Sequence, residues 1–311
     1  MNPDVRRPAG LAMPEIVECV PNFSEGRRKE VVDAIAQAIA SVHGVRVLDQ
    51  EMDADHNRSV ITFVGDRTSV AEAAFRGAKK AVELIDMSRH RGEHPRVGAL
   101  DVLPFVPIAG VTMDDCVDLA RAVGKRIADE LQVPVYLYEA AATRPDRRAL
   151  PDVRRGEYEG LKTEIETKPD RKPDFGSPRL HPTAGACIVG ARPVLIAWNV
   201  NLRTTDVGVA KRIAKAIRES DGGLPAVRAK GFDLADRGLV QVSMNMVDYR
   251  KTSLVQAFEA IRALAAKEGV EIAESEIIGL VPLDALVEAA TQYLKLARFH
   301  REQILETRLW E

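Results

Sequence analysis

Residues 90–98 of this 311-residue chain (His-Arg-Gly-Glu-His-Pro-Arg-Val-Gly) concentrate side chains that exchange protons and bind anions. The glycines and the proline interrupt a helix here, so His90 and His94 do not share one helical face, and the order of a zinc-protease motif is missing. A loop before an apolar strand favours a single histidine acting as general acid and base. A metal pair and an ordinary polar loop remain the alternatives.

A second polar cluster occupies residues 51–58. Its carboxylates, Glu51, Asp53 and Asp55, precede His56 and Arg58. Oxygen ligands of this kind suit a divalent cation, and they equally suit a cationic organic group. Asp-rich turns are common between strands, so the residues alone favour a charged hairpin tip.

Other catalytic devices are missing from the sequence. It contains no phosphate-binding G-x-x-x-x-G-K-[ST] loop, no G-x-G-x-x-G after a strand and no G-x-S-x-G elbow. The three cysteines, Cys19, Cys116 and Cys187, share no short spacing. They therefore form no zinc ribbon and indicate a reducing, cytoplasmic environment.

Charge and hydropathy narrow the class of partner. Forty-four Lys and Arg face 46 Asp and Glu, for a net charge of −2, which argues against a nucleic-acid binder. No segment reaches the ~18 consecutive apolar residues of a membrane span, so we expect no membrane partner. Residues 1–13 lack the apolar run of a signal peptide and are expected to be a flexible tail.

The apolar periodicity predicts the same rhythm of elements in both halves of the chain. Strands are expected at residues 15–23, 45–49, 59–64, 99–107, 134–138, 194–200, 226–233, 239–247 and 276–281. Helices are expected at residues 31–42, 69–85, 114–131, 205–218, 253–267 and after Pro282, with Ser69 and Glu72 as a capping box. The pattern indicates an α/β (α+β) fold of two ferredoxin-like βαββαβ subdomains, whose sheets face a central groove with helices outside.

The expected boundary between the N-terminal subdomain (residues 14–193) and the C-terminal subdomain (residues 194–311) follows a charged segment. Residues 151–182 carry five prolines and 14 charges, seven of each sign, which indicates a loop-rich, solvated stretch. Such a segment either lines a binding site or serves as a flexible linker.

Several long segments resemble the glutamate formimidoyltransferase family. They are residues 17–26 (Val-Glu-Cys-Val-Pro-Asn-Phe-Ser-Glu-Gly), 86–102 (Asp-Met-Ser-Arg-His-Arg-Gly-Glu-His-Pro-Arg-Val-Gly-Ala-Leu-Asp-Val), 133–138 (Val-Pro-Val-Tyr-Leu-Tyr), 156–159 (Gly-Glu-Tyr-Glu), 173–176 (Pro-Asp-Phe-Gly) and 279–283 (Gly-Leu-Val-Pro-Leu). The matches keep their order through nearly the whole chain after residue 14. They are far more specific than any short motif.

The resemblance implies transfer of a formimidoyl group from N-formimidoyl-L-glutamate to tetrahydrofolate in histidine degradation. It further implies two subdomains around a folate tunnel, a homodimer, no metal, and His94 as the catalytic residue. The chain ends after the transferase portion, so any cyclodeaminase is expected to be a separate protein. The folate-binding residues that the resemblance implies are Gly176, Ser177, Pro178, Arg179, Leu180, His181, Pro182, Thr183, Ala184 and Gly185.

The residue types suit this chemistry. Folate N5 attacks an amidinium carbon and the glutamate nitrogen leaves protonated, so one imidazole, His94, serves as both base and acid. Glu51 or Asp53 is expected to hold the cationic formimidoyl group, and Arg58 or Arg96 to pair with substrate carboxylates.

Three other functions remain open from the sequence. One is a related one-carbon enzyme that acts on 5-formyltetrahydrofolate. Another is a folate-binding module without catalysis. The third is a metal hydrolase built from His90, His94 and the cluster at residues 53–56.

Overall fold

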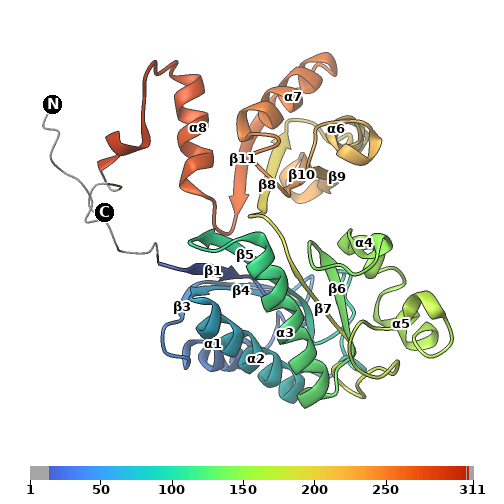
Figure 1. Cartoon of the computed structure of the whole chain (residues 1–311). Coiled ribbons are helices and arrows are strands. Elements are labelled where there is room, and N and C mark those ends of the chain that lie inside the picture. Colours follow the sequence, from blue (N-terminus) through green and yellow to red (C-terminus); the bar gives the residue numbers. More distant parts are fainter. Residues whose placement is uncertain (1–13, 306, 308–311) are drawn as a thin grey trace, which may run out of the picture. The chain divides into compact units, whose positions relative to one another are not determined.

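The computed structural model describes residues 14–305 and residue 307 (Figure 1). The expected tail at residues 1–13 lies outside the described residues. The described chain is a mixed α/β protein with one seven-stranded sheet, one four-stranded sheet and eight α-helices. It divides into two compact units, one ending at Pro193 and one beginning at Val194. Within the described residues, no helix combines the length and the apolar character that crossing a membrane requires.

The first unit, as described from residue 14 onward, contains seven strands and five α-helices. The strands are β1 (Ile16–Cys19), β2 (Asn22–Phe23), β3 (Arg46–Asp53), β4 (Arg58–Gly65), β5 (Leu100–Ala109), β6 (Val135–Glu139) and β7 (Cys187–Ala191). The helices are α1 (Lys29–Ala40), α2 (Arg67–Leu84), α3 (Met113–Leu131), α4 (Leu150–Val153) and α5 (Glu157–Glu164). The expected strand at residues 15–23 is split in two at Pro21, which cannot donate a ladder hydrogen bond.

The order of strands in this sheet differs from the predicted repeat. The strands β3, β4, β1 with β2, and β5 lie side by side and pair antiparallel, as a βαββαβ unit requires. However, β7 then pairs parallel with both β5 and β6 and lies between them. The strand expected at residues 134–138 is present as β6, but β7, which was not expected, follows it in the chain. A five-residue strand buried on both faces has no polar alternation, so the sequence carries little signal for it.

Helices cover both faces of the first sheet. The apolar faces of α1, α2 and α3 pack on one face over a core that includes Phe23, Ile39 and Phe105. A smaller core on β5, β6 and β7 joins Tyr136 and Ile188 to residues of α4 and α5. The segment at residues 151–182, expected to be loop-rich, thus contributes two helices that are anchored to the sheet.

The start of α2 corrects a second expectation. Its N-cap is Asp66, whose carboxylate accepts hydrogen bonds from the backbone N–H groups of Thr68 and Ser69. The Ser69 hydroxyl donates to the same carboxylate at 2.8 Å. Glu72 accepts from Arg76 instead, so the predicted capping box of Ser69 and Glu72 does not form.

The second unit consists of β8 (Ile196–Leu202), α6 (Val207–Ile217), β9 (Val227–Leu234), β10 (Leu239–Met246), α7 (Leu254–Lys267), β11 (Ile272–Ile278) and α8 (Leu283–Tyr293). Its strands pair antiparallel in the order β11, β8, β10, β9. The buried faces of α6 and α7 pack on this sheet around Trp198 and Ile213. Strand β11 begins and ends earlier than the expected 276–281.

Candidate active site

His94 lies in the loop between α2 and β5, and its hydrogen bonds define its tautomer. Its Nε2 lies 2.5 Å from Nη1 of Arg58, and its Nδ1 lies 2.7 Å from the carbonyl oxygen of Pro95. A guanidinium group can only donate, so Nε2 accepts and Nδ1–H donates to Pro95. The imidazole is therefore neutral, with its basic nitrogen facing Arg58.

Burial and neighbouring cations explain why His94 stays neutral. Burial has the largest effect, the charges of Arg58 and Arg154 add to it, and together they lower the pKa of His94 to about 3. Burial, followed by the charge of Arg154, also lowers the pKa of Arg58 to about 10, so Arg58 remains protonated at neutral pH. The site thus combines an uncharged base with two cations.

The hairpin of β3 and β4 positions Arg58. Asp53 and Arg58 are opposite each other where the strands meet, and Asn57 takes a left-handed conformation with φ of 48° in the turn. The Asp53 carboxylate accepts from the backbone N–H of His56 at 2.9 Å and lies 2.7 Å from its Nδ1. Residues 51–58 thus form the charged hairpin tip that the residues alone favour. Glu51 lies further back on β3, opposite Val60.

The second histidine of the loop is held by the protein itself. Nε2 of His90 lies 2.9 Å from the carbonyl oxygen of Asn57, and Nδ1 accepts from Nε of Arg96 at 3.3 Å. Both nitrogens are therefore occupied, and burial lowers the pKa of His90. His90 acts as a structural partner of the hairpin. Among the described residues, no group of three or more His, Cys, Asp and Glu side chains is placed to hold a metal ion.

Arg96, the other arginine expected at the site, binds carboxylates of the protein. Its Nη1 donates to Glu157 at 2.9 Å, and its Nη2 donates to Glu159 at 2.6 Å. Arg96 is buried, with 7% of its surface exposed. Hence Arg58, and not Arg96, contacts His94 in this structure.

Two residues of the site were missed from the sequence. Arg154, which follows α4, donates through Nη2 to the Asp101 carboxylate on β5. Asp101 also accepts from the backbone N–H of Val97 at 2.9 Å. An aspartate inside an apolar strand was the available signal for Asp101. Nothing distinguished Arg154 from the other charges of its segment.

Two pockets adjoin at this site. The pocket beside His94 has a free volume of about 10 Å³, room for about one water molecule. A larger pocket of about 370 Å³ shares Ser24, Asn57 and His90 with it. The larger pocket is within the usual size range of small-molecule sites. Its charged lining residues are Glu25, Arg27, Arg28, Asp86 and Arg89.

The segment at residues 176–185 reaches the His94 loop at its C-terminal end. The backbone N–H of Ala99 donates to the carbonyl oxygen of Ala184 at 2.8 Å, and that of Met87 donates to Thr183 at 2.7 Å. Gly98 and Gly185 also form a β-bridge. The first four residues of the segment are exposed. The end of this segment therefore shares backbone hydrogen bonds with residues on both sides of His94.

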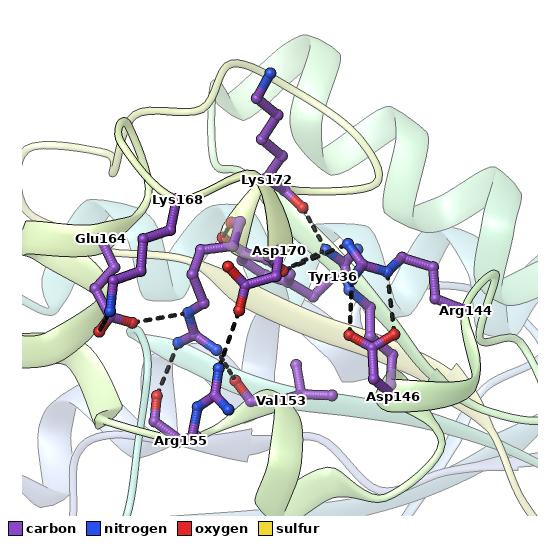
Figure 2. Close-up of polar contacts among 11 residues, drawn as sticks. Tyr136, Arg144, Asp146, Val153, Arg155, Glu164, Lys168, Asp170 and Lys172 are labelled. Atoms are coloured by element: carbon purple, nitrogen blue, oxygen red, sulfur yellow. Dashed lines mark hydrogen bonds and ion pairs between the residues drawn. The ribbon is translucent and has the colours of Figure 1, made fainter.

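A buried arginine, Arg171, holds the chain just before residues 176–185. Nη2 of Arg171 donates to the carbonyl oxygen of Arg155 at 2.8 Å, and Nη1 donates to that of Val153 at 3.3 Å (Figure 2). The Arg171 Nε lies 3.2 Å from Glu164 of α5. Tyr136 of β6 donates its hydroxyl to the Arg171 carbonyl oxygen at 2.6 Å. These contacts of Arg171 attach the chain before residues 176–185 to both α5 and the sheet.

The fold and the site together define an α/β protein with a neutral, partly buried histidine on which the charges of two arginines act. Residues 16–192 match the formiminotransferase domain, N-terminal subdomain, and residues 197–307 match the formiminotransferase domain. The glutamate formimidoyltransferase of Thermoplasma acidophilum is 53% identical over 94% of this chain and 97% of its own length. That of Streptococcus pyogenes serotype M1 is 49% identical over 96% and 99%.

A longer relative matches over part of its length. The formimidoyltransferase-cyclodeaminase of Mus musculus is 45% identical over 96% of this chain, which spans 57% of that protein. The chain belongs to the glutamate formimidoyltransferase family.

Proposed function

We propose that this chain transfers the formimidoyl group of N-formimidoyl-L-glutamate to N5 of tetrahydrofolate, giving 5-formimidoyltetrahydrofolate and L-glutamate. Its activity is that of a glutamate formimidoyltransferase, a one-carbon transferase of histidine and folate metabolism. The observation that carries the chemical proposal is the tautomer of His94, whose Nε2 is the basic atom.

His94 moves one proton in each direction. Folate N5 attacks the amidinium carbon, and Nε2 of His94 removes the proton from N5 as the new C–N bond forms. The resulting imidazolium then gives that proton to the glutamate nitrogen as the old C–N bond breaks. Glutamate leaves as the amine, and no net proton is consumed. The hydrogen bond from Nδ1–H to Pro95 keeps the ring oriented through both transfers.

The other predicted site residues have different positions in this proposal. Arg58 is the arginine that binds a substrate carboxylate, because Arg96 already binds Glu157 and Glu159. Residues 176–185 bind the folate, which their hydrogen bonds to the His94 loop support. Asp53 carries a negative charge at an exposed position near Arg58, where a cationic formimidoyl group would be attracted.

The proposal also covers the fold of the two units, the oligomeric state, the location and the alternative substrate. Strands β1 to β5 of the first sheet, with β1 and β2 sharing one position, and the four strands of the second sheet follow the ferredoxin-like order. A homodimer and a cytoplasmic location follow from the resemblance in sequence, and three free, buried cysteines agree with a reducing compartment. The alternative use of 5-formyltetrahydrofolate needs no change in the role of His94.

Transfer is tested by incubating the protein with formimidoylglutamate and tetrahydrofolate while following glutamate release and the folate spectrum. We expect His94→Ala to lower kcat by roughly 10²–10⁴-fold, because the variant lacks the proton shuttle. His43→Ala removes an exposed histidine and serves as the matched control. Near-normal turnover by His94→Ala would contradict the assignment, and transfer from 5-formyltetrahydrofolate alone would favour the alternative substrate.

A further inference from the structure

The positive charges of Arg58 and Arg154 both act on His94. Arg58 donates to His94, and Arg154 donates to the Asp101 carboxylate. The negative charges of Asp101, Asp53 and Glu51 act on Arg58. The Nε atoms of both arginines are buried and have no hydrogen-bond acceptor. Buried donors without acceptors are costly, and ordered water or a bound ion can satisfy them.

The contact between Arg58 and His94 also blocks the proposed chemistry. A general base must offer a free lone pair, and the lone pair on Nε2 of His94 accepts from Arg58 at 2.5 Å. The free volume beside the ring, about 10 Å³, is too small for a carboxylate group. An anion can therefore enter this pocket only if a lining side chain moves, and Arg58 is the side chain that covers Nε2 of His94.

Resting on the proposed function, we propose that Arg58 and Arg154 bind the α-carboxylate of formimidoylglutamate and that this binding withdraws Arg58 from Nε2 of His94. Formimidoylglutamate, the formimidoyl donor, thus frees the basic nitrogen of His94 that then acts on it. Asp101, held by the Val97 N–H, fixes Arg154 in place for this contact.

Bond connectivity selects the donor's α-carboxylate over the carboxylates of folate. In formimidoylglutamate, the nitrogen that His94 must protonate and the α-carboxylate are attached to the same carbon atom. An anion site in contact with His94 therefore suits this carboxylate. The glutamate of folate is separated from N5 by the aminobenzoyl group, so its carboxylates lie far from the reacting atoms.

The electrostatic consequence can be measured on His94 itself. The ionisable groups that line its pocket come from several elements, namely His56 in the hairpin turn, Arg58 on β4, His90 and Arg96 in its own loop and Asp101 on β5. Arg154, which follows α4, acts on His94 through its charge, and Asp53 and Glu51 on β3 act on Arg58. Burial and the two positive charges hold the pKa of His94 to about 3. A carboxylate on Arg58 and Arg154 cancels one of these charges, so the pKa of His94 must rise when the site fills.

The test follows the His94 imidazole by nuclear magnetic resonance in the full chain with 15N-labelled histidine. Saturating L-glutamate, the product, is the probe, and glutarate, which lacks the amine, is the second probe. We expect both to raise the pKa of His94 by at least one unit. No change in that pKa with saturating glutamate would overturn the proposal.

Kinetics of matched variants test the role of Arg154. Arg154→Gln should raise KM for formimidoylglutamate by at least tenfold and leave KM for tetrahydrofolate nearly unchanged. Arg155→Gln removes a neighbouring exposed arginine and should leave both constants as they are. Arg154→Lys, which keeps the charge beside Asp101, should give a smaller rise in KM and serves if the Gln variant does not fold.

The outcomes separate this inference from the proposed function. If Arg154→Gln and Arg155→Gln have the same KM for the donor, the carboxylate site is wrong even though the chain transfers formimidoyl groups. If the unmodified chain shows no transfer at all, and glutamate still raises the pKa of His94, then the carboxylate site stands and the proposed function fails.

Discussion

Arg147 offers the sharpest test of how the chain before residues 176–185 is held. It has 4% of its surface exposed and donates to the carboxylate of Asp174 and to the carbonyl oxygens of Asp170 and Lys172. Its guanidinium also lies 5.1 Å from the ring centroid of Tyr136. We predict that Arg147→Met destabilises the first unit and raises KM for tetrahydrofolate, because Asp174 lies two residues before the proposed folate segment.

The magnitude follows from what the substitution leaves behind. Removing one partner of a buried ion pair costs about 3–5 kcal/mol. The Asp174 carboxylate, 8% exposed, keeps hydrogen bonds from the Leu137 N–H at 2.8 Å and from the Thr143 hydroxyl. These two donors place the cost at the lower end, at about 3 kcal/mol in the free energy of unfolding. With an m value of roughly 3 kcal/mol/M, the urea midpoint should fall by about 1 M.

Arg144→Met is the matched control. Arg144 pairs with Asp146 through two hydrogen bonds of 3.0 and 2.8 Å (Figure 2). Because its side chain is 38% exposed, its loss should cost less than about 1 kcal/mol.

Urea unfolding followed by far-UV circular dichroism measures both variants. Tryptophan emission serves as a reference, since Trp198 is buried in the second unit. Equal midpoints for Arg147→Met and Arg144→Met would refute the reasoning. An unchanged KM for tetrahydrofolate would show that Arg147 stabilises the first unit without affecting folate binding.

Two further predictions concern acid stability and backbone packing. The pKa of His94 is about 3 in the folded chain and about 6.5 when unfolded, so its contribution to stability is complete above pH 6.5 and decreases as the pH falls. Between pH 7 and 5 it should lose about 2 kcal/mol, and urea midpoints of His94→Asn should lack this decrease. Gly98→Ala places a methyl group 1.9 Å from the Ala186 carbonyl oxygen and should prevent normal folding, as seen by circular dichroism. Gly160→Ala, in α5 with open space around it, should instead raise stability by about 1 kcal/mol.

The apolar periodicity of the sequence was sufficient to predict most helices and strands of the fold. The predicted helix at residues 114–131 agrees with α3 (Met113–Leu131) within one residue, because its amphipathic pattern is long. In the structure, Thr112 caps its start. Strand β7 and helix α5 were not predicted. Their residues pack against distant parts of the sheet, and tertiary contacts stabilise them more than local preference does.

The two arginines expected to bind substrate show where sequence reasoning ends. Arg58 and Arg96 have the same chemistry, and each lies near a predicted site histidine in the chain. Only the structure distinguishes them, because Arg96 meets Glu157 and Glu159 of α5 whereas Arg58 meets His94, 36 residues away. Such partners depend on how a hairpin and a helix pack, which residue type does not encode.

The sequence by itself determined the family, the alternation of strands and helices, and the loop that contains His94, because these depend on local patterns and long, ordered motifs. The tertiary structure decided the tautomer of His94, the contact that Arg58 makes with it, and the pairing of Arg154 with Asp101 across 53 residues of chain. The physical reason is that the protonation and availability of a side chain depend on burial and on neighbours brought together by sheet register and helix packing.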